Sequence, residues 1–259
     1  MLWHVSLLST LDAYYDAAPR ATASDEELGP FTLFLPRPDE GPPLYARPSL
    51  GSDARVSAAQ VAKVRERQRE LGVPEALEWV HERTPTLLEA ARAAGLQVRE
   101  HPLLVLPGGA GTVAAPLPQS CSVRMLGADS ADVGVALGAV DAGFAGSDSP
   151  EHPPPGHVPQ LMRDGLLAMA AAYEDQRCVG GGSHSPRGEA SELTGIAVLP
   201  RARRRGVGAA ITGALVADAQ ARGVTTVFLS AQDDTVARVY ERIGFQRVAT
   251  ACVAEPSGA

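Results

Sequence analysis

The chain has 259 residues, 45% of them hydrophobic and 20% charged, which predicts one or two globular domains with ample apolar material for a core. Its formal net charge of −7 argues against a nucleic acid as the main partner, because proteins that bind nucleic acids usually carry a basic face. The three cysteines lie far apart without metal-ligand spacing, so we expect free thiols and neither a disulfide framework nor a metal site.

The N-terminal segment has neither the basic region nor the small-residue cleavage site of a secretory signal. No apolar run approaches the roughly 20 residues that a membrane-spanning helix needs. We therefore expect a soluble, cytoplasmic protein without a membrane partner.

The first hundred residues alternate between helical and strand patterns. Apolar side chains at helical spacing predict a helix over residues 5–17. Ser57 is placed to cap a second helix, and Gly72 and Gly95 stand where the second and third helices would end. The same criteria predict those helices at 56–71 and 84–95, and strands at 31–35, 44–50, 76–80 and 101–106.

Residues 107–119 hold glycine, proline and small residues without periodicity, which predicts a linker between a domain at 1–106 and a second domain at 120–259. The segment 146–156 is predicted to be a loop bordering a substrate pocket. Other elements of the second domain are predicted as helices at 130–144, 158–164, 209–221 and 235–243, and strands at 121–126, 166–173, 178–183, 192–199, 224–230 and 245–253. The apolar face of the last helix comprises Val236, Val239, Tyr240 and Ile243.

The two halves end alike, with helix, glycine, strand, helix, glycine and strand at 56–106 and again at 209–253. The marker glycines are 23 residues apart in the first copy and 21 in the second. Such a long repeat indicates a duplicated domain. The first copy has no glycine loop, so we expect it to keep the scaffold without a cofactor site. Two unrelated α/β halves with similar helix ends are the alternative.

A strand, a basic glycine loop and a helix follow one another between residues 196 and 221. The apolar run at 196–199 stops at Pro200, and arginines lead into Gly206-Val207-Gly208. At such a helix start, bare backbone N–H groups and the helix dipole of about half a positive charge attract anions. The pattern predicts a grip on the pyrophosphate of a nucleotide-like cofactor.

This second half resembles the GNAT superfamily of acyl-CoA-dependent N-acetyltransferases. The family motif Arg/Gln-x-x-Gly-x-Gly/Ala stands here as Arg203-Arg204-Arg205-Gly206-Val207-Gly208, directly after Val198-Leu199-Pro200. A later family element, ending in hydrophobic-Gly-Phe, stands as residues 237–245 and contains Tyr240. The chain therefore resembles tandem-GNAT proteins with one degenerate domain. We expect an α/β protein of two GNAT-like domains, each a twisted mixed β-sheet flanked by helices.

The resemblance implies that acetyl-CoA binds as co-substrate between two splayed strands. Backbone groups of Ile196 and Val198 would bind the pantetheine, and the amides from Arg204 to Ala209 would hold the pyrophosphate. The predicted cofactor-binding residues are Ile196, Ala197, Val198, Arg203, Arg204, Arg205, Gly206, Val207, Gly208, Ala209 and Tyr240.

The chemistry requires three further roles. An amine with a pKa near 10 must lose a proton before it attacks a thioester, and Glu192 is the candidate base, with Glu189 as the alternative. The Val198 N–H would donate to the developing oxyanion. Tyr240 would protonate the departing thiolate, unless it is a core aromatic. His184 either lines the acceptor site or is a solvated hairpin histidine.

Asp234 stands where the family often has a cofactor-contacting asparagine, and a carboxylate beside phosphate disfavours that contact. The acceptor is expected to be a small-molecule amine or a peptide, and the protein a monomer or homodimer.

Three other functions stay open. A Rossmann-type enzyme would need glycine or alanine where Ile211 stands, and an acidic residue at the end of the next strand. A non-catalytic acyl-CoA sensor would share the fold. A transferase could use another acyl group or an alcohol acceptor.

Overall fold

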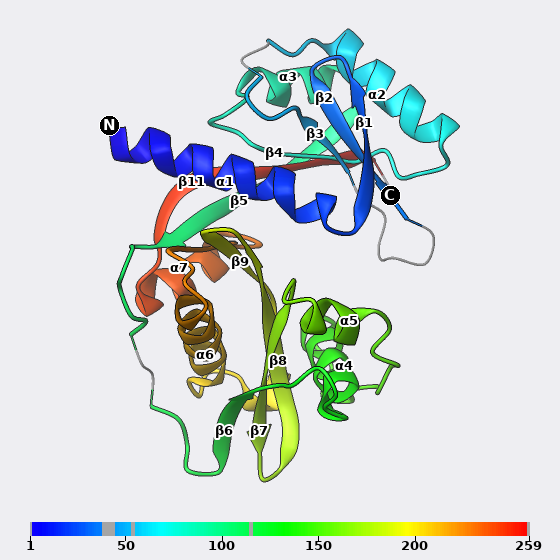
Figure 1. Cartoon of the computed structure of the whole chain (residues 1–259). Helices are drawn as coiled ribbons and strands as arrows, with labels where there is room; N and C mark the ends of the chain where they lie inside the picture. The colour runs from blue at the N-terminus through cyan, green and yellow to red at the C-terminus, as the bar shows by residue number, and fades with distance from the viewer. Residues whose placement is uncertain (1, 38–44, 53–54, 114–115, 258–259) are drawn as a thin grey trace. The chain divides into compact units, whose positions relative to one another are not determined.

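The computed structural model describes residues 2–37, 45–52, 55–113 and 116–257 (Figure 1). The chain divides into two compact units. Unit 1 comprises Met1–Leu103, Ser230–Asp234 and Val248–Ala259, and unit 2 comprises Leu104–Leu229 and Thr235–Arg247. The predicted α/β class is confirmed: strands and helices alternate along the chain, and the strands form mixed sheet structure.

In unit 1 the strands follow the order β1-β2-β3-β4-β11-β5. The helices are α1 (Leu2–Arg20), α2 (Ala58–Glu70) and α3 (Thr86–Ala93). The strands are β1 (Ala23–Leu28), β2 (Phe31–Pro36), β3 (Ala46–Pro48), β4 (Leu77–Val80), β5 (Leu96–Leu106) and β11 (Gln246–Pro256), of which β5 and β11 belong mostly to this unit. Strand β11 pairs antiparallel with β4, with Cys252 opposite Trp79.

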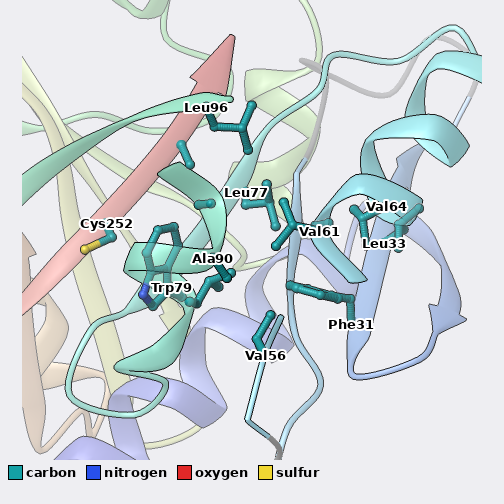
Figure 2. Packing of buried hydrophobic residues seen from close by; sticks show 14 residues of the cluster. Phe31, Leu33, Val56, Val61, Val64, Leu77, Trp79, Ala90, Leu96 and Cys252 are labelled. Atoms are coloured by element: carbon teal, nitrogen blue, oxygen red, sulfur yellow. The ribbon is translucent and has the colours of Figure 1, made fainter. Parts of the chain in front are cut away.

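The main core of unit 1 lies where α2 and α3 cover the sheet (Figure 2). Phe31 and Leu33 of β2 meet Val61 and Val64 of α2 there, all with at most 1% of their surface exposed. A buried ion pair lies on the other face, between Arg47 of β3 and an aspartate of α1. Alternation of side chains along each strand separates the two environments.

In unit 2 the strand order is β10-β9-β8-β7-β6. The helices are α4 (Asp132–Phe144), α5 (Val158–Arg163), α6 (Val207–Ala221) and α7 (Asp234–Ile243). The strands are β6 (Cys121–Met125), β7 (Ala168–Glu174), β8 (Arg177–Arg187), β9 (Ala190–Val198) and β10 (Thr226–Ser230). The strands β6 to β9 pair antiparallel, and β9 pairs with β10 in parallel.

Glycines in the middle of β8 allow helices to approach both faces of this sheet (Figure 1). A Cβ on Gly181 would lie 3.3 Å from a methyl of Val140 in α4. A Cβ on the next residue, Gly182, would lie 3.2 Å from a methyl of Leu215 in α6. Helices α4 and α6 therefore pack on opposite faces of β8.

The four marker glycines of the repeat all end helices as predicted. Gly72, Gly95, Gly223 and Gly244 have φ between +66° and +119°, the left-handed region that favours glycine. Ser57 caps α2 as predicted.

Several local expectations differ from the structure. Strand β5 begins at Leu96 and β8 ends at Arg187, so both extend beyond the predicted strands 101–106 and 178–183. The sequence analysis missed β1, because this charged strand has only one buried side chain and pairs only with β2. The predicted strand 44–50 is short, since β3 ends at Pro48, and its first residue lies outside the described part. Val239 was wrongly placed on a buried face: 45% of it is exposed, and α7 buries Ala237 instead.

Candidate active site

The N-terminus of α6 is open. Its N-cap is Gly206, with φ +80°, and no side chain caps the helix. The first helical hydrogen bond runs from the Ala210 N–H to the Gly206 carbonyl, so the amides of residues 207–209 precede the helical ladder. The preceding Arg204 also has a positive φ, of +60°. The loop therefore presents backbone donors at the positive end of the helix dipole.

The equivalent helix of the first repeat copy is closed. At the start of α2, the Gln60 N–H donates to Ser57 Oγ at 3.4 Å, and the Ser57 N–H donates to Oε1 of Gln60 at 2.9 Å. This capping box uses the donors that an anion would need. The start of α2 therefore lacks the open amides found at α6, and a cofactor loop in the second copy alone stays a prediction.

The glycine at position 208 is not required by packing inside the protein. A Cβ there would meet only one atom within 4 Å, a methyl of Val198 at the ordinary contact distance of 3.8 Å. Gly208 is also helical, so its backbone needs no special freedom. Its lack of a side chain leaves room in front of the amides, as the close approach of a phosphate would require.

Strand β9 leaves its neighbour β10 after the first third of its length. The two strands pair over only three residues, ending with Glu192 opposite Phe228, while β9 continues to Val198. A left-handed Gly195, at φ +61°, accompanies a shift in the register with β8. The second half of β9 thus has an edge that β10 does not cover.

The amide of Val198 faces this uncovered edge. The next N–H, that of Leu199, donates to the Val179 carbonyl on β8 at 2.8 Å. Successive backbone groups of a strand point to opposite sides, so Val198 directs its N–H away from β8. Ile196 lies in the bulge beside Gly195. Val198 and Ile196 are the residues whose backbone groups the sequence analysis assigned to the pantetheine.

Three of the four arginines in the loop make contacts within the protein. Arg201 binds Asp148, with its N–H donating to Oδ1 at 3.0 Å, and Arg205 pairs with Glu174 at 2.7 Å. Arg203 donates to the carbonyls of Val198 at 2.9 Å and Gly143 at 2.5 Å, and so joins the ends of β9 and α4.

The side chain of Arg204 is exposed and makes no hydrogen bond or ion pair within the described part of the chain. It is the member of the cluster that can contact a phosphate without breaking another bond.

Glu192 is the last β9 residue paired with β10, and it lies opposite Ser185 on β8. Its side chain is partly buried. Glu189, the alternative base, is exposed in the turn before β9. Of the two carboxylates, Glu192 is therefore the one at the point where the strands diverge.

Tyr240 lies in α7 with its side chain partly buried, and its ring meets that of Phe245 edge-on, with centroids 5.9 Å apart. Burial raises the pKa of Tyr240 to about 12. The phenol therefore keeps its proton at neutral pH, which a general acid needs and which a packing residue would share.

His184 is neither solvated nor open to an acceptor, contrary to both readings of the sequence. It has no exposed surface, and its ring bonds Ser191 of β9 and Asp218 of α6. The sequence gives no local sign of this network, since Asp218 lies 34 residues away. Asp234 is exposed at the start of α7.

Two glycines of α4 that the sequence analysis did not single out hold the 146–156 loop. A Cβ on Gly138 would lie 1.6 Å from the Glu151 carbonyl oxygen, and one on Gly134 would lie 2.7 Å from the Pro153 carbonyl oxygen. The four-residue spacing of small residues was the available signal. The loop backbone thus packs directly on α4, whose Gly143 in turn touches Val198.

A polar cavity of about 400 Å³ lies at the β7–β8 turn, lined by Glu174, Asp175, Arg177, Val179 and Arg201. Its two acids and two arginines give it no dominant charge. The described residues contain no cluster of metal-ligating side chains. None of their helices is both long and apolar enough to span a membrane.

Comparison with known proteins finds one family profile that matches part of the chain. Residues 143–245 match the profile of the Acetyltransferase (GNAT) family. A search of curated protein sequences finds no significant match.

Among solved structures, a GCN5-related N-acetyltransferase from Kribbella flavida is similar, with a TM-score of 0.76 and 19% identity over 97% of this chain and 96% of that one. One from Sphaerobacter thermophilus has a TM-score of 0.60 and 16% identity over 97% and 92%. A tandem GNAT protein from the clavulanic acid biosynthesis pathway has a TM-score of 0.54 and 17% identity over 88% and 79%. Residues 143–245 therefore match the GNAT acetyltransferase family, and the fold of the chain is that of GNAT proteins.

Proposed function

We propose that the chain transfers an acetyl group from acetyl-CoA to a primary amine of a small molecule or peptide. The observation that carries the proposal is the pairing of two open features within unit 2: an uncapped helix N-terminus at α6 and the uncovered edge of β9 that leads into it. One extended ligand with a pyrophosphate in its middle would satisfy both.

The residues present fit acetyl-CoA. The amides of Val207, Gly208 and Ala209 would hold the pyrophosphate, with Arg204 as the available side-chain cation. Ile196 and Val198 would bind the pantetheine through their backbone groups. When bound, acetyl-CoA supplies the acetyl group as a reactive thioester.

Glu192 would take the proton of the incoming amine, directly or through water. The Val198 N–H, at the uncovered edge of β9, would donate to the thioester carbonyl, and Ile196 would bind the pantetheine through its backbone groups.

Tyr240 would give a proton to the departing thiolate. Burial raises the pKa of this phenol to about 12, above the pKa of a free thiol, near 8.5. Complete proton transfer to the thiolate is therefore uphill, so Tyr240 would first donate a hydrogen bond to the sulfur. A phenol that donates without ionising still stabilises the negative charge that develops on sulfur.

Two experiments test this function. Calorimetry with CoA asks whether the site binds, and a panel of amines, amino acids, aminoglycosides and peptides with acetyl-CoA asks whether it turns over. Glu192→Gln should keep CoA affinity and lower kcat by about 100-fold, the ordinary contribution of a general base.

Binding without turnover on any acceptor would favour an acyl-CoA sensor. Turnover with a longer acyl-CoA alone would change the donor, and no binding at all would refute the proposal.

A further inference from the structure

A buried polar chain joins β8, β9 and α6 of unit 2. Nδ1 of His184 lies 2.9 Å from Oγ of Ser191, and its Nε2 lies 2.8 Å from Oδ2 of Asp218. His184 and Ser191 have no exposed surface. On the outer side, Arg222 Nε donates to Asp218 at 2.5 Å. Four polar groups thus form one continuous chain from the strand to the helix surface.

The direction of these hydrogen bonds follows from the charges. Burial lowers the pKa of His184, against the opposing effect of Asp218, so the ring is neutral at neutral pH. Burial raises the pKa of Asp218, but the hydrogen bonds from Arg222 and His184 outweigh it, so this group is ionised. The carboxylate only accepts, and His184 therefore carries its proton on Nε2 and accepts from the Ser191 hydroxyl. Ser191 cannot act as a nucleophile, because no substrate reaches it.

The surface of β8 and β9 on which α6 rests otherwise offers little that fixes the position of the helix. Gly180 and Gly182 face this helix side of β8, and a Cβ on Gly182 would lie 2.8 Å from Ile196 and 3.2 Å from Leu215. Glycines offer no ridge to hold a helix in one register, and apolar contact is not directional. Among the described residues, no other side-chain hydrogen bond joins α6 to these strands.

The register of α6 matters because the two halves of the proposed site lie on different elements. Asp218 is eleven residues from Val207, which is about 16 Å along the helix. A tilt of about 4° about that point would move the first turn by about 1 Å, a displacement that can cost about 100-fold in a productive geometry.

We propose that His184 is a positioning residue, which fixes α6 against β9 so that one acyl-CoA can contact the strand edge and the helix amides together. This inference rests on the proposed function. It predicts that variants of His184 lose affinity only for ligands that contact both β9 and α6.

The test compares CoA with its nucleotide half, adenosine 3′-phosphate 5′-diphosphate, which reaches only the α6 amides. In His184→Leu the Kd for CoA should rise about tenfold while that for the nucleotide half stays within about twofold, because only the spanning ligand needs the register. Asp218→Ala, at a partly exposed helix position, should behave alike without disturbing the core. Asp218→Asn keeps an acceptor for Nε2 and should bind CoA as the wild type does.

Stability is separated from register by a double variant. His184→Leu with Ser191→Ala leaves no buried hydroxyl without a partner, and Asp218 keeps Arg222, so the melting temperature should recover while the CoA affinity stays low. Recovery of both together would overturn the proposal, as would equal losses for CoA and its nucleotide half. Failure of the wild type to bind CoA would instead refute the proposed function, and this inference with it.

Discussion

Gly208 offers a direct test of the anion site at α6, because the folded protein can accept a side chain there while a bound phosphate needs that space. A side chain at this position would meet only the Val198 methyl, 3.8 Å from its Cβ, so the folded chain can accept one. Gly208→Ala should leave the free energy of unfolding unchanged or raise it by up to about 1 kcal/mol, since alanine favours helix. The family motif also accepts alanine at this position, so Gly208→Ala should leave CoA affinity nearly unchanged and serves as the control for larger side chains.

Gly208→Glu adds both an obstruction and a charge. A carboxylate about 5 Å from a phosphate charge, at an effective dielectric constant of about 20, costs about 3 kcal/mol for each phosphate charge. CoA affinity should therefore fall by more than about 100-fold. Gly208→Gln has nearly the same shape without the charge, so the difference between the two variants isolates the electrostatic part.

Isothermal calorimetry measures the affinities, and thermal unfolding checks the fold. Unchanged CoA affinity in a folded Gly208→Glu protein would show that the pyrophosphate does not bind at this helix. If Gly208→Glu loses no more CoA affinity than Gly208→Gln, the new side chain only obstructs the ligand and no anion is bound beside it.

Three other variants test separate parts of the chain. Tyr240→Phe should lower kcat by about 10- to 100-fold with acetyl-CoA affinity nearly unchanged, because only the donated proton is lost; equal losses with reduced thermal stability would mark a packing residue. Glu78→Gln should stabilise the protein at pH 8 by at most about 3 kcal/mol, and hardly at pH 4.5. Burial raises the pKa of Glu78 to about 7, so the stability that its neutral form contributes is present at low pH and lost as the pH rises through 7; equal effects at both pH values in urea denaturation would contradict this. Ser57→Ala should cost about 1 kcal/mol of unfolding free energy and leave CoA affinity unchanged, because it removes only the cap of α2; a change in affinity would link unit 1 to binding.

Some relationships could not be predicted because residues distant in sequence make them. His184 meets Asp218 across 34 residues, and Arg203 reaches the Gly143 carbonyl across 60. Sequence analysis treated His184 as an exposed or pocket histidine and Arg203 as a phosphate ligand. The sequence shows which groups can form hydrogen bonds, but only packing of α4 and α6 against the sheet selects their partners.

The sequence pattern could not predict how far a side chain is exposed either. Val239 fits the helical spacing of α7, yet 45% of it is exposed, because periodicity defines a face without saying how far a neighbour covers it. The prediction missed strand β1 for the opposite reason: its charged residues carry no strand pattern, and the strand forms by pairing with β2.

The sequence by itself determined the local features of this protein. Left-handed glycines end the repeated helices, and the uncapped glycine loop opens α6, because backbone conformation depends on nearby residues. The tertiary structure decided where β9 separates from β10, which arginine stays available and what holds α6 in register. These depend on contacts between elements far apart in the chain, which only the assembled sheet brings together.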